Sequence, residues 1–402
     1  MDRNYTMSIY PECSIPLVVS SKINRKIQTI NNYGYEIWNY DNDYVCFDEK
    51  QSIKNCRSVL FSYPQHNLLS IGPGKTTDSE KFCEKHDCNG SIYVNEYIDG
   101  TMVHLFYDKR RKIWEISSKS HIGGSQKLQN YQTKTNKTLM EMFKEGLGYD
   151  SVSDLQNMSV IKDFPKNYSY QFVLLHPENV ILYPIKQSLL YLVAVYDITQ
   201  NTRRAIHIPP MIYEKWYFLQ NTTILFPTQK KIDKWEEISK EQQSVYQVNE
   251  NISGYMVLHI ESGERTKIMN PHYIQSKELN KISPRLGLYY LCLHKRDLVN
   301  EYLVFFPQFR KTFRKFQGLF HDYIEELHSA YLVKYVWKNA LHGKINDKYN
   351  PYVDDIHREL YIPSLKTDKR KITKQTVYQY MMNKPPGEIL YILCSCRRKS
   401  AI

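Results

Sequence analysis

The chain has 402 residues, of which 42% are hydrophobic and 24% are charged, and this composition excludes the disordered and collagen-like classes. Its length allows two or three domains. The net charge of +12 suits an anionic partner, most often nucleic acid, although a merely soluble basic protein fits that charge equally well.

From the N-terminus to about residue 275, short runs of apolar, β-branched and aromatic residues alternate with Gly, Pro or Asn, as is typical of strands in an α+β domain. One short helix is expected at 138–145, with Thr138 as its N-cap and Gly146 as its end. The polar stretch 229–247 is predicted to be a surface insertion, for which a helical conformation is also open. The expected strands are 91–94, 102–107, 113–117, 170–175, 180–183, 189–196 and 254–260.

From about residue 280 the hydrophobic period changes. Large apolar residues recur every three or four positions from Phe309 to Tyr335, which predicts one face of a long helix that begins after Pro307. Two further helices are expected at 352–360 and 373–383, and two prolines end the second of these. The chain is therefore predicted to have a mixed domain, 1–278, and an all-helical C-terminal domain, 279–402.

The eight cysteines do not have the spacing of a secreted disulfide framework. Cys83, His86 and Cys88 could suggest a metal, but no second pair at zinc spacing follows, so no metal site is predicted. The sequence shows neither an N-terminal signal nor an apolar run of about 18 residues. These features predict a protein of the cytoplasm or of a virion, with no membrane association.

Four segments of the first domain occur in a characteristic order, and each could carry part of a nucleotide site. They resemble motif I, the Ser-Lys-Gly-Ser segment, the motif III strand and motifs IV–V of covalent nucleotidyltransferases. The chain thus resembles the RNA-ligase-like proteins of large cytoplasmic DNA viruses, and its last third resembles the helical tail of those viral proteins. It is also similar to the phage tRNA-repair RNA ligase. The segments are YVNEYIDGT (93–101), EISSKSHIGG (115–124), YQFVLLHPEN (170–179), and ISGYMV (252–257) with TKIMNPHY (266–273).

The resemblance implies an N-terminal nucleotidyltransferase domain of the ATP-grasp-like ligase type, with antiparallel sheets around a cleft. It also implies ATP with Mg²⁺ as cofactor, RNA as partner, and the host cytoplasm or the virion as location.

The nucleophile position of motif I is occupied by Tyr97. A ligase of this type attacks the α-phosphate of ATP with a lysine amine, and no lysine lies between Lys85 and Lys109. A tyrosine hydroxyl, with a pKa of about 10, is mostly neutral at cell pH. Tyr97 is therefore predicted to be inactive in catalysis and to serve in packing or in ligand contact.

Four positions are nucleotide-binding by resemblance: Asp99, Lys119, Gln171 and Lys267. A tight turn alone would also explain Asp99 and the Gly100 that follows it, because Gly supplies positive φ. The two lysines could hold a phosphate as point charges or could be ordinary surface residues.

Several charged groups of the ligase pattern are missing. Gln171 replaces the motif III carboxylate, Ser253 replaces the motif IV glutamate, and Met269 replaces the second lysine of motif V. Because Mg²⁺ is usually held by one or two carboxylates together with substrate phosphates, these losses remove its natural anchor. The sequence predicts a pseudoenzyme site that no longer transfers a nucleotide.

Two short segments mimic other sites. The segment 72–76 ends like a P-loop, but it lacks the first glycine, and Pro73 has no amide to donate to a phosphate. The segment 176–179 could suggest a metal site, but Pro and Asn after a strand favour a turn.

Three functions remain open at this point. The first is a catalytically degenerate RNA ligase that binds RNA. The second is a divergent ATP-dependent RNA ligase that is still active, and the third is a virion or scaffold protein that uses the fold for structure.

Overall fold

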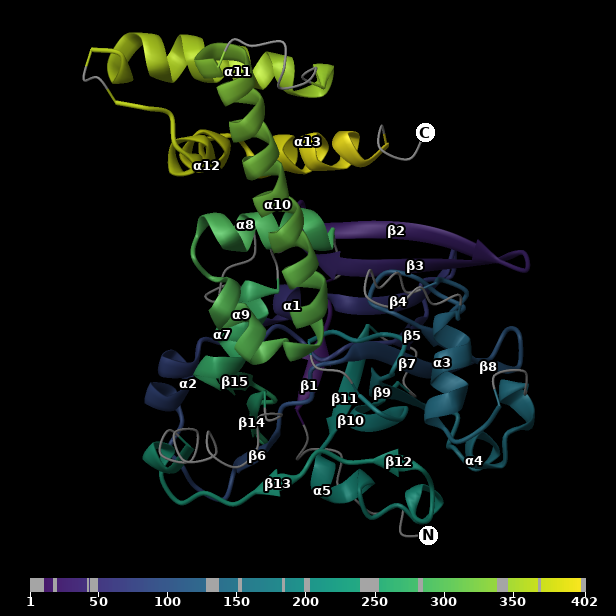
Figure 1. The fold of residues 1–402 in the computed structure, drawn as a ribbon. Helices are drawn as coiled ribbons and strands as arrows, with labels where there is room; N and C mark the ends of the chain where they lie inside the picture. The colour runs from purple at the N-terminus through teal and green to yellow at the C-terminus, as the bar shows by residue number, and fades with distance from the viewer. Residues whose placement is uncertain are drawn as a thin grey trace. The chain divides into compact units, whose positions relative to one another are not determined.

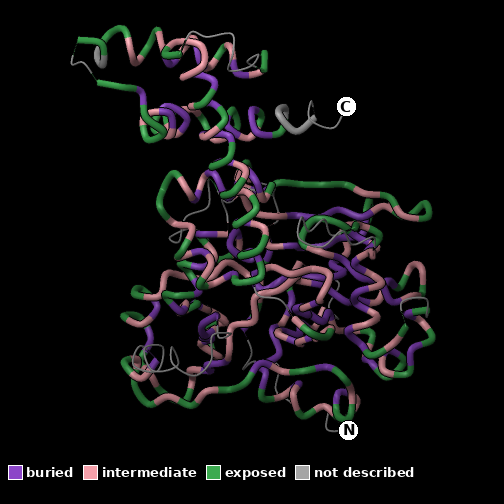
Figure 2. Tube along the Cα trace, in the orientation of Figure 1, coloured by how far each residue is buried: buried purple, intermediate pink, exposed green. Residues whose placement is uncertain are grey.

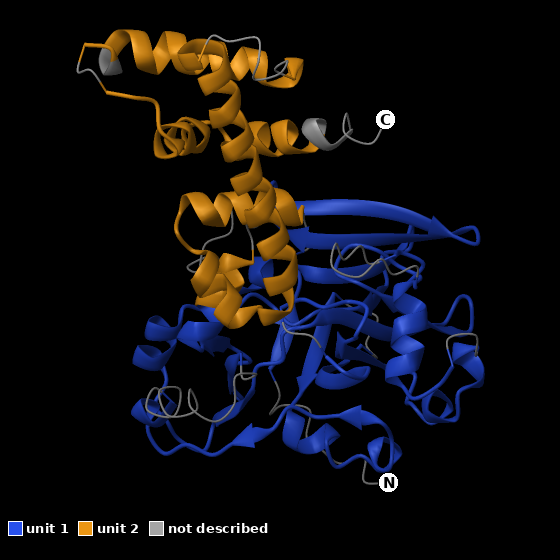
Figure 3. Ribbon diagram, in the orientation of Figure 1, with its two compact units in different colours: residues 1–274 blue, residues 275–402 orange. Residues whose placement is uncertain are grey.

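The computed structural model describes residues 11–16, 20–41, 43, 50–127, 137–150, 154–182, 185–198, 203–238, 253–280, 285–337, 346–367 and 370–398. The chain divides into two compact units, residues 1–274 and 275–402 (Figure 3). The division falls inside helix α7 (Pro271–Leu279), four residues before the boundary that the sequence predicts.

Three sheets form unit 1 (Figure 1), and all their strand pairs are antiparallel except that of β12 with β10. The first sheet has the order β1-β11-β10-β9-β7-β8, the second β13-β6-β14-β15, and the third β2-β3-β4-β5. The bounds in the first sheet are β1 (Glu12–Ser14), β11 (Arg204–Ile208), β10 (Leu189–Asp197), β9 (Tyr168–Leu175), β7 (Thr101–Asp108), β8 (Ile113–Ser117) and β12 (Ile224–Leu225). The remaining strands are β13 (Gln229–Lys230), β6 (Ile92–Glu96), β14 (Gly254–His259), β15 (Arg265–Met269), β2 (Ile23–Ile30), β3 (Tyr33–Tyr40), β4 (Arg57–Tyr63) and β5 (Leu68–Ser70).

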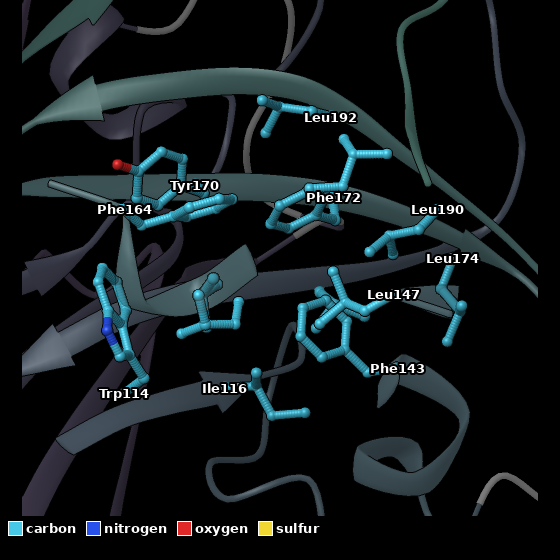
Figure 4. Close-up of a cluster of buried hydrophobic side chains, with 14 of the residues drawn as sticks. Trp114, Ile116, Phe143, Leu147, Phe164, Tyr170, Phe172, Leu174, Leu190 and Leu192 are labelled. Atoms are coloured by element: carbon cyan, nitrogen blue, oxygen red, sulfur yellow. The ribbon is translucent and has the colours of Figure 1, made fainter. Parts of the chain in front are cut away.

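One face of the first sheet carries the main core of unit 1 (Figure 4). Helices α3 (Leu139–Gly146) and α4 (Ser159–Lys162) supply Phe143 and Ile161 to this core, where they meet the alternate residues Tyr170, Phe172 and Leu174 of β9. Burial of each such side chain contributes roughly 1.5–3 kcal/mol. The opposite side chains of β9 therefore point to the other face of the sheet.

That second face is shared between the other two sheets. Phe106, Ala194 and Tyr196 pack against the third sheet in two clusters that include Trp38 and Leu60. The second sheet buries its own outer face separately, around Val94, Tyr255 and Val257. Its inner face and the rest of the first sheet enclose the pockets described below, and Figure 2 shows how far the buried residues extend through these sheets.

The regular elements of unit 2, within the residues that the structure describes there, are helices. Helix α10 packs on α8, α11, α12 and α13, and its Phe313 stacks on Tyr302 with ring centres 5.3 Å apart. The bounds are α8 (Leu286–Lys295), α9 (Val299–Phe305), η3 (Pro307–Phe309), α10 (Arg310–Tyr331), η4 (Leu332–Trp337), η6 (Asp347–Tyr349), α11 (Asn350–Ile356), η7 (His357–Leu365), α12 (Lys374–Asn383) and α13 (Pro386–Arg398).

Most predicted elements of unit 1 are present, with three corrections. The apolar run 180–183 was expected to be a strand, but residues 180–182 form no strand, and residue 183 lies outside the described residues. Helix α3 includes Gly146, and the glycine with positive φ (83°) is Gly148. The stretch 229–247 is not simply an insertion, because its start pairs with β6 as β13; residues 239–247 lie outside the described part of the chain.

In unit 2 the sequence missed α13. The prolines that end α12 also begin α13, because Pro is well tolerated in the first turn of a helix. Over the described part of the chain, the model has no helix that combines the length and the apolar character needed to span a membrane.

Candidate nucleotide-binding cleft

Strand β6 leads the motif I turn into the space between the first and second sheets. Along this strand Val94 points into the outer core, while Tyr93 and Asn95 line a pocket on the inner side. Tyr97 follows in the same alternation, and its backbone N–H donates to the carbonyl of Gly254 (2.9 Å). The strand register therefore places Tyr97 beside the motif IV segment.

Three of the predicted site residues meet at this turn. The Tyr97 hydroxyl donates to Asp99 Oδ1 (3.3 Å), and the hydroxyl of the buried Tyr273 donates to Asp99 Oδ2. The Lys267 amine, on β15, lies 5.4 Å from the centre of the Tyr97 ring. Asp99 is thus an acceptor for two phenols and is not explained by the turn alone.

Two glycines let the backbones of this site come close together. A Cβ on Gly100 would lie 2.4 Å from Val173 Cγ1 and 2.8 Å from the Leu174 carbonyl oxygen. Gly254 has a φ of +143°, and a Cβ there would lie 2.4 Å from the Ile268 carbonyl oxygen. Gly100 was expected to supply a positive φ. Instead, a glycine is required there because the backbone approaches β9 closely.

A pocket of about 300 Å³ opens beside Tyr97. This volume is at the lower end of the range for small-molecule sites, and the combination of apolar walls with a few polar groups is also typical of them. The pocket includes Ser253, the residue at the motif IV position. Its lining residues are Glu96, Tyr97, Ile98, Asp99, Leu175, Asn179, Ile181, Leu182, Ile185, Leu189, Tyr191, Ser253 and Tyr273.

A second, narrower pocket between the same two sheets contains Arg265. Its guanidinium donates to the carbonyl oxygens of Pro73 (3.1 Å) and Gly74 (2.7 Å). Burial, together with the charge of Arg57, lowers the pKa of Arg265 to about 10, and Tyr97 is among the groups whose charge acts on it. Arg265 is therefore within electrostatic range of both the Tyr97 turn and Arg57.

The charge of Arg57 acts on both Arg265 and Lys119, and of these three cations only Arg265 lines a pocket described above. Burial, and next the charge of Arg57, lowers the pKa of Lys119, whose backbone carbonyl accepts from Ser58 Oγ (3.0 Å). Within the described residues, none of these three cations forms an ion pair with a carboxylate. Like charges that converge without acids raise the free energy of the empty cleft, and a bound phosphate would relieve that repulsion.

Gln171, the fourth predicted nucleotide-binding residue, does not lie at the Tyr97 turn. It is fully buried on β9, where its Nε2 donates to Ser169 Oγ (2.7 Å). Its neighbour His104 is also buried, and burial, then the charge of Arg57, lowers the pKa of His104 to about 3. The motif III position thus belongs to a neutral buried polar cluster and does not line either pocket.

Two carboxylates, Glu96 and Asp99, line the larger pocket, and the motif III and motif IV positions add none. Asp99 is engaged by two phenols, Gln171 is buried, and Ser253 carries no charge. No three His, Cys, Asp or Glu side chains converge as metal ligands anywhere in the described ranges. The larger pocket has the volume of a small-molecule site, and Arg265 supplies a cation in the narrower pocket.

The contacts of the segments 72–76 and 176–179 show what each segment does. At 72–76 the backbone presents carbonyls to Arg265, the opposite polarity to a phosphate cradle of amides, so a P-loop is excluded. At 176–179 the Asn179 amide donates to the His176 carbonyl (2.9 Å), and His176 Nε2 lies 2.9 Å from a Glu145 carboxylate oxygen. The second segment is the predicted turn.

Sequence reasoning missed Arg57, Arg265 and Tyr273. Arg265 could have been found, because it stands two residues before Lys267 on one strand and so shares its face. Tyr273 lies in the motif V segment but on a helix. Nothing local marks Arg57, which lies at the start of β4 in the third sheet and acts on Arg265 through its charge.

Comparison with known proteins gave matches among solved structures alone. No family model matches the chain, and no curated protein matches it. A Naegleria gruberi RNA ligase mutant with ATP and Mn is similar with a TM-score of 0.33 and 10% identity, over 49% of this chain and 54% of that ligase, so the chain spans about half of its length. An archaeal ATP-dependent RNA ligase is similar in two forms, with TM-scores of 0.39 and 0.42, identities of 9% and 8%, and coverage of 74% and 70% of this chain and 68% and 65% of that one.

Proposed function

We propose that the chain is an RNA-ligase-like pseudoenzyme whose cleft binds the phosphates of a nucleotide or of an RNA end without forming a covalent nucleotidyl intermediate. The motif order along the sequence supports the ligase-like class. It also supports, as part of the proposal, a viral protein of the host cytoplasm or the virion.

The observation that carries the proposal is the combination of a retained cation cluster with a replaced nucleophile. Arg265 lines the narrower pocket, the charge of Arg57 acts on both Arg265 and Lys119, and none of the three has a carboxylate partner in the described part of the chain. Tyr97 stands where the attacking amine belongs, and its hydroxyl proton is donated to Asp99. The cleft can therefore bind a phosphate group without transferring a nucleotide to Tyr97.

Covalent transfer would need more than a nucleophile. The charge that develops on the transferred phosphate must be stabilised, and in this family a metal on carboxylates and a second lysine supply that stabilisation. Here Ser253 and Met269 occupy two of those positions and carry no charge. The proposal therefore expects ATP to leave the cleft unchanged.

The first experiment measures binding and covalent transfer in the same samples. The full chain is titrated with ATP and, separately, with a 5′-phosphorylated RNA oligonucleotide, and each sample is then analysed by intact mass with Mg²⁺ or Mn²⁺ present. We expect saturable binding and no mass gain. A gain of one nucleotide that Tyr97→Phe abolishes would overturn the proposal in favour of an active ligase, and the absence of binding would favour a scaffold protein.

A matched pair of variants tests the site itself. Arg57→Gln with Lys119→Gln should weaken ATP binding at least tenfold, because two of the three cations that act on one another around Arg265 are removed. Lys109→Gln with Lys162→Gln removes the same charge from exposed positions outside the pocket linings and should leave binding unchanged. Equal weakening in both variants would mean that only net charge matters and would contradict the site.

A further inference from the structure

The first two turns of α10 carry four cations in six residues: Arg310, Lys311, Arg314 and Lys315. All four are exposed, whereas Phe313 between them is buried. At 100° per residue they cover the side of the helix that faces away from its buried stripe.

These four side chains have no acidic partners within the residues that the structure describes. The acids of the same helix are used differently. Glu325 pairs with Lys374 (2.5 Å) and Glu326 lies 3.9 Å from Lys348, so both contact neighbouring segments of unit 2. The positive charge at the start of α10 is therefore not neutralised by its own helix.

This arrangement disfavours the isolated helix. Arg310 and Arg314, like Lys311 and Lys315, are like charges at i and i+4, which destabilise a helix by roughly 0.2–0.5 kcal/mol a pair. Cations in the first turn also oppose the helix dipole, which favours acids there. Helix stability thus does not explain why these four cations lie together, whereas a bound polyanion would.

We infer that this face of α10 binds the phosphate backbone of an RNA strand. Four long side chains whose i, i+4 pairs are about 6 Å apart along one axis match a linear row of phosphates. A membrane surface fits poorly, because the apolar stripe of α10 is buried against other helices of unit 2 and cannot insert. The surface belongs to unit 2 and does not depend on the cleft proposed above.

The test uses the full chain and a fluorescent 20-nucleotide oligo(U), with binding measured by anisotropy from 50 to 300 mM salt. Changing all four residues to Gln should raise Kd at least tenfold at 50 mM salt. It should also reduce the slope of log K against log salt by about 3, since each single-strand phosphate contact contributes about 0.7.

Two matched variants separate this surface from net charge. A charge-keeping exchange, Arg310→Lys, Lys311→Arg, Arg314→Lys and Lys315→Arg, should bind almost like the native chain. A second quadruple Gln variant at Lys334, Arg358, Lys374 and Lys384, whose amines or guanidinium pair with acids, should keep most of the affinity. Circular dichroism melts confirm that each variant is folded.

The outcome is distinct from that of the cleft experiment. The Gln quartet on α10 should leave ATP binding unchanged, while the Arg57 and Lys119 variant should leave most of the salt-dependent oligo(U) binding intact. If the folded α10 variant keeps the native affinity and salt slope, or if the Lys334 set loses as much, the inference is wrong even where the cleft still binds ATP.

Discussion

The Lys267 amine lies 5.4 Å from the centre of the Tyr97 ring, so the cation of the motif V strand rests on the aromatic residue that occupies the nucleophile position. A cation–π contact at a partly exposed site contributes roughly 0.5–1 kcal/mol. Lys267 and Tyr97 therefore stabilise each other's position beside the turn that carries Asp99.

Restoring the amine alone should not restore the reaction. In Tyr97→Lys the new amine would lie near Lys267, and a neighbouring cation lowers an amine pKa, which favours a nucleophile. Ser253 and the buried Gln171 would still supply no carboxylate at the motif III and motif IV positions, and Glu96 and Asp99 would be the only acids in the lining of the pocket beside Tyr97. We expect no covalent label from α-labelled ATP on a denaturing gel, with Tyr97→Phe as the matched control.

Label on Tyr97→Lys alone, absent from Tyr97→Phe, would show that one replacement disabled the site and that the missing carboxylates are dispensable. A known active ligase labelled alongside confirms that the assay works.

Asp99 should be important for stability as well as for any ligand. In Asp99→Ala the hydroxyl of the buried Tyr273 loses the acceptor shown here, and an unsatisfied buried donor costs about 1–3 kcal/mol. Asp99→Asn keeps one acceptor oxygen and should cost less. Urea unfolding of the two variants checks this, and equal, small losses would return Asp99 to the role of a simple turn residue.

The ordered motifs predicted part of the site. They named Tyr97, Asp99 and Lys267 by resemblance, and the structure places these three residues near one another. Lys119 was also named by resemblance, but the effect of Arg57 on it could not be predicted, because the two residues are far apart in sequence and come close only in the folded chain.

One apolar run was predicted to be a strand but instead lines a pocket. The run 180–183 was expected to be a strand because of its composition, but Ile181 and Leu182 instead line the pocket beside Tyr97. Periodicity cannot separate a short buried strand from an apolar loop that covers a cavity. Pro386 was predicted only to end a helix, but it begins α13, because a proline is tolerated in the first turn of a helix.

The N-terminal cap of α3 offers a test of local stability. Thr138 accepts from the Glu141 amide, and the Glu141 carboxylate accepts from the Thr138 amide (2.6 Å), which together form a capping box. Thr138→Ala should destabilise unit 1 by about 1 kcal/mol, whereas Thr138→Ser keeps the hydroxyl and should cost much less. Chemical denaturation followed by circular dichroism measures both, and equal losses would mean that the methyl group matters rather than the cap.

Glu264 should make the stability of unit 1 depend on acid pH. Burial alone would raise the pKa of this carboxyl, but hydrogen bonds from Lys85, His86 and Thr77 outweigh burial and lower the pKa from 4.5 to about 2. Because the folded-state value is the lower one, the carboxylate stabilises the fold above pH 4.5, and this contribution is lost as the pH falls towards 2. His259, stacked on His86 with ring centres 4.1 Å apart, adds a second titrating group nearby.

Glu264→Gln isolates this contribution from that of the other carboxyls. The difference in unfolding free energy between the native chain and the variant should be on the order of 2 kcal/mol at pH 5 to 7, after allowance for solvent screening at the exposed Lys85, and should shrink towards zero near pH 2. Urea titrations at several pH values measure it. A difference that stays constant down to pH 2 would mean that Glu264 contributes by packing or neutral hydrogen bonds, since a charge that disappears with acid cannot give a constant term.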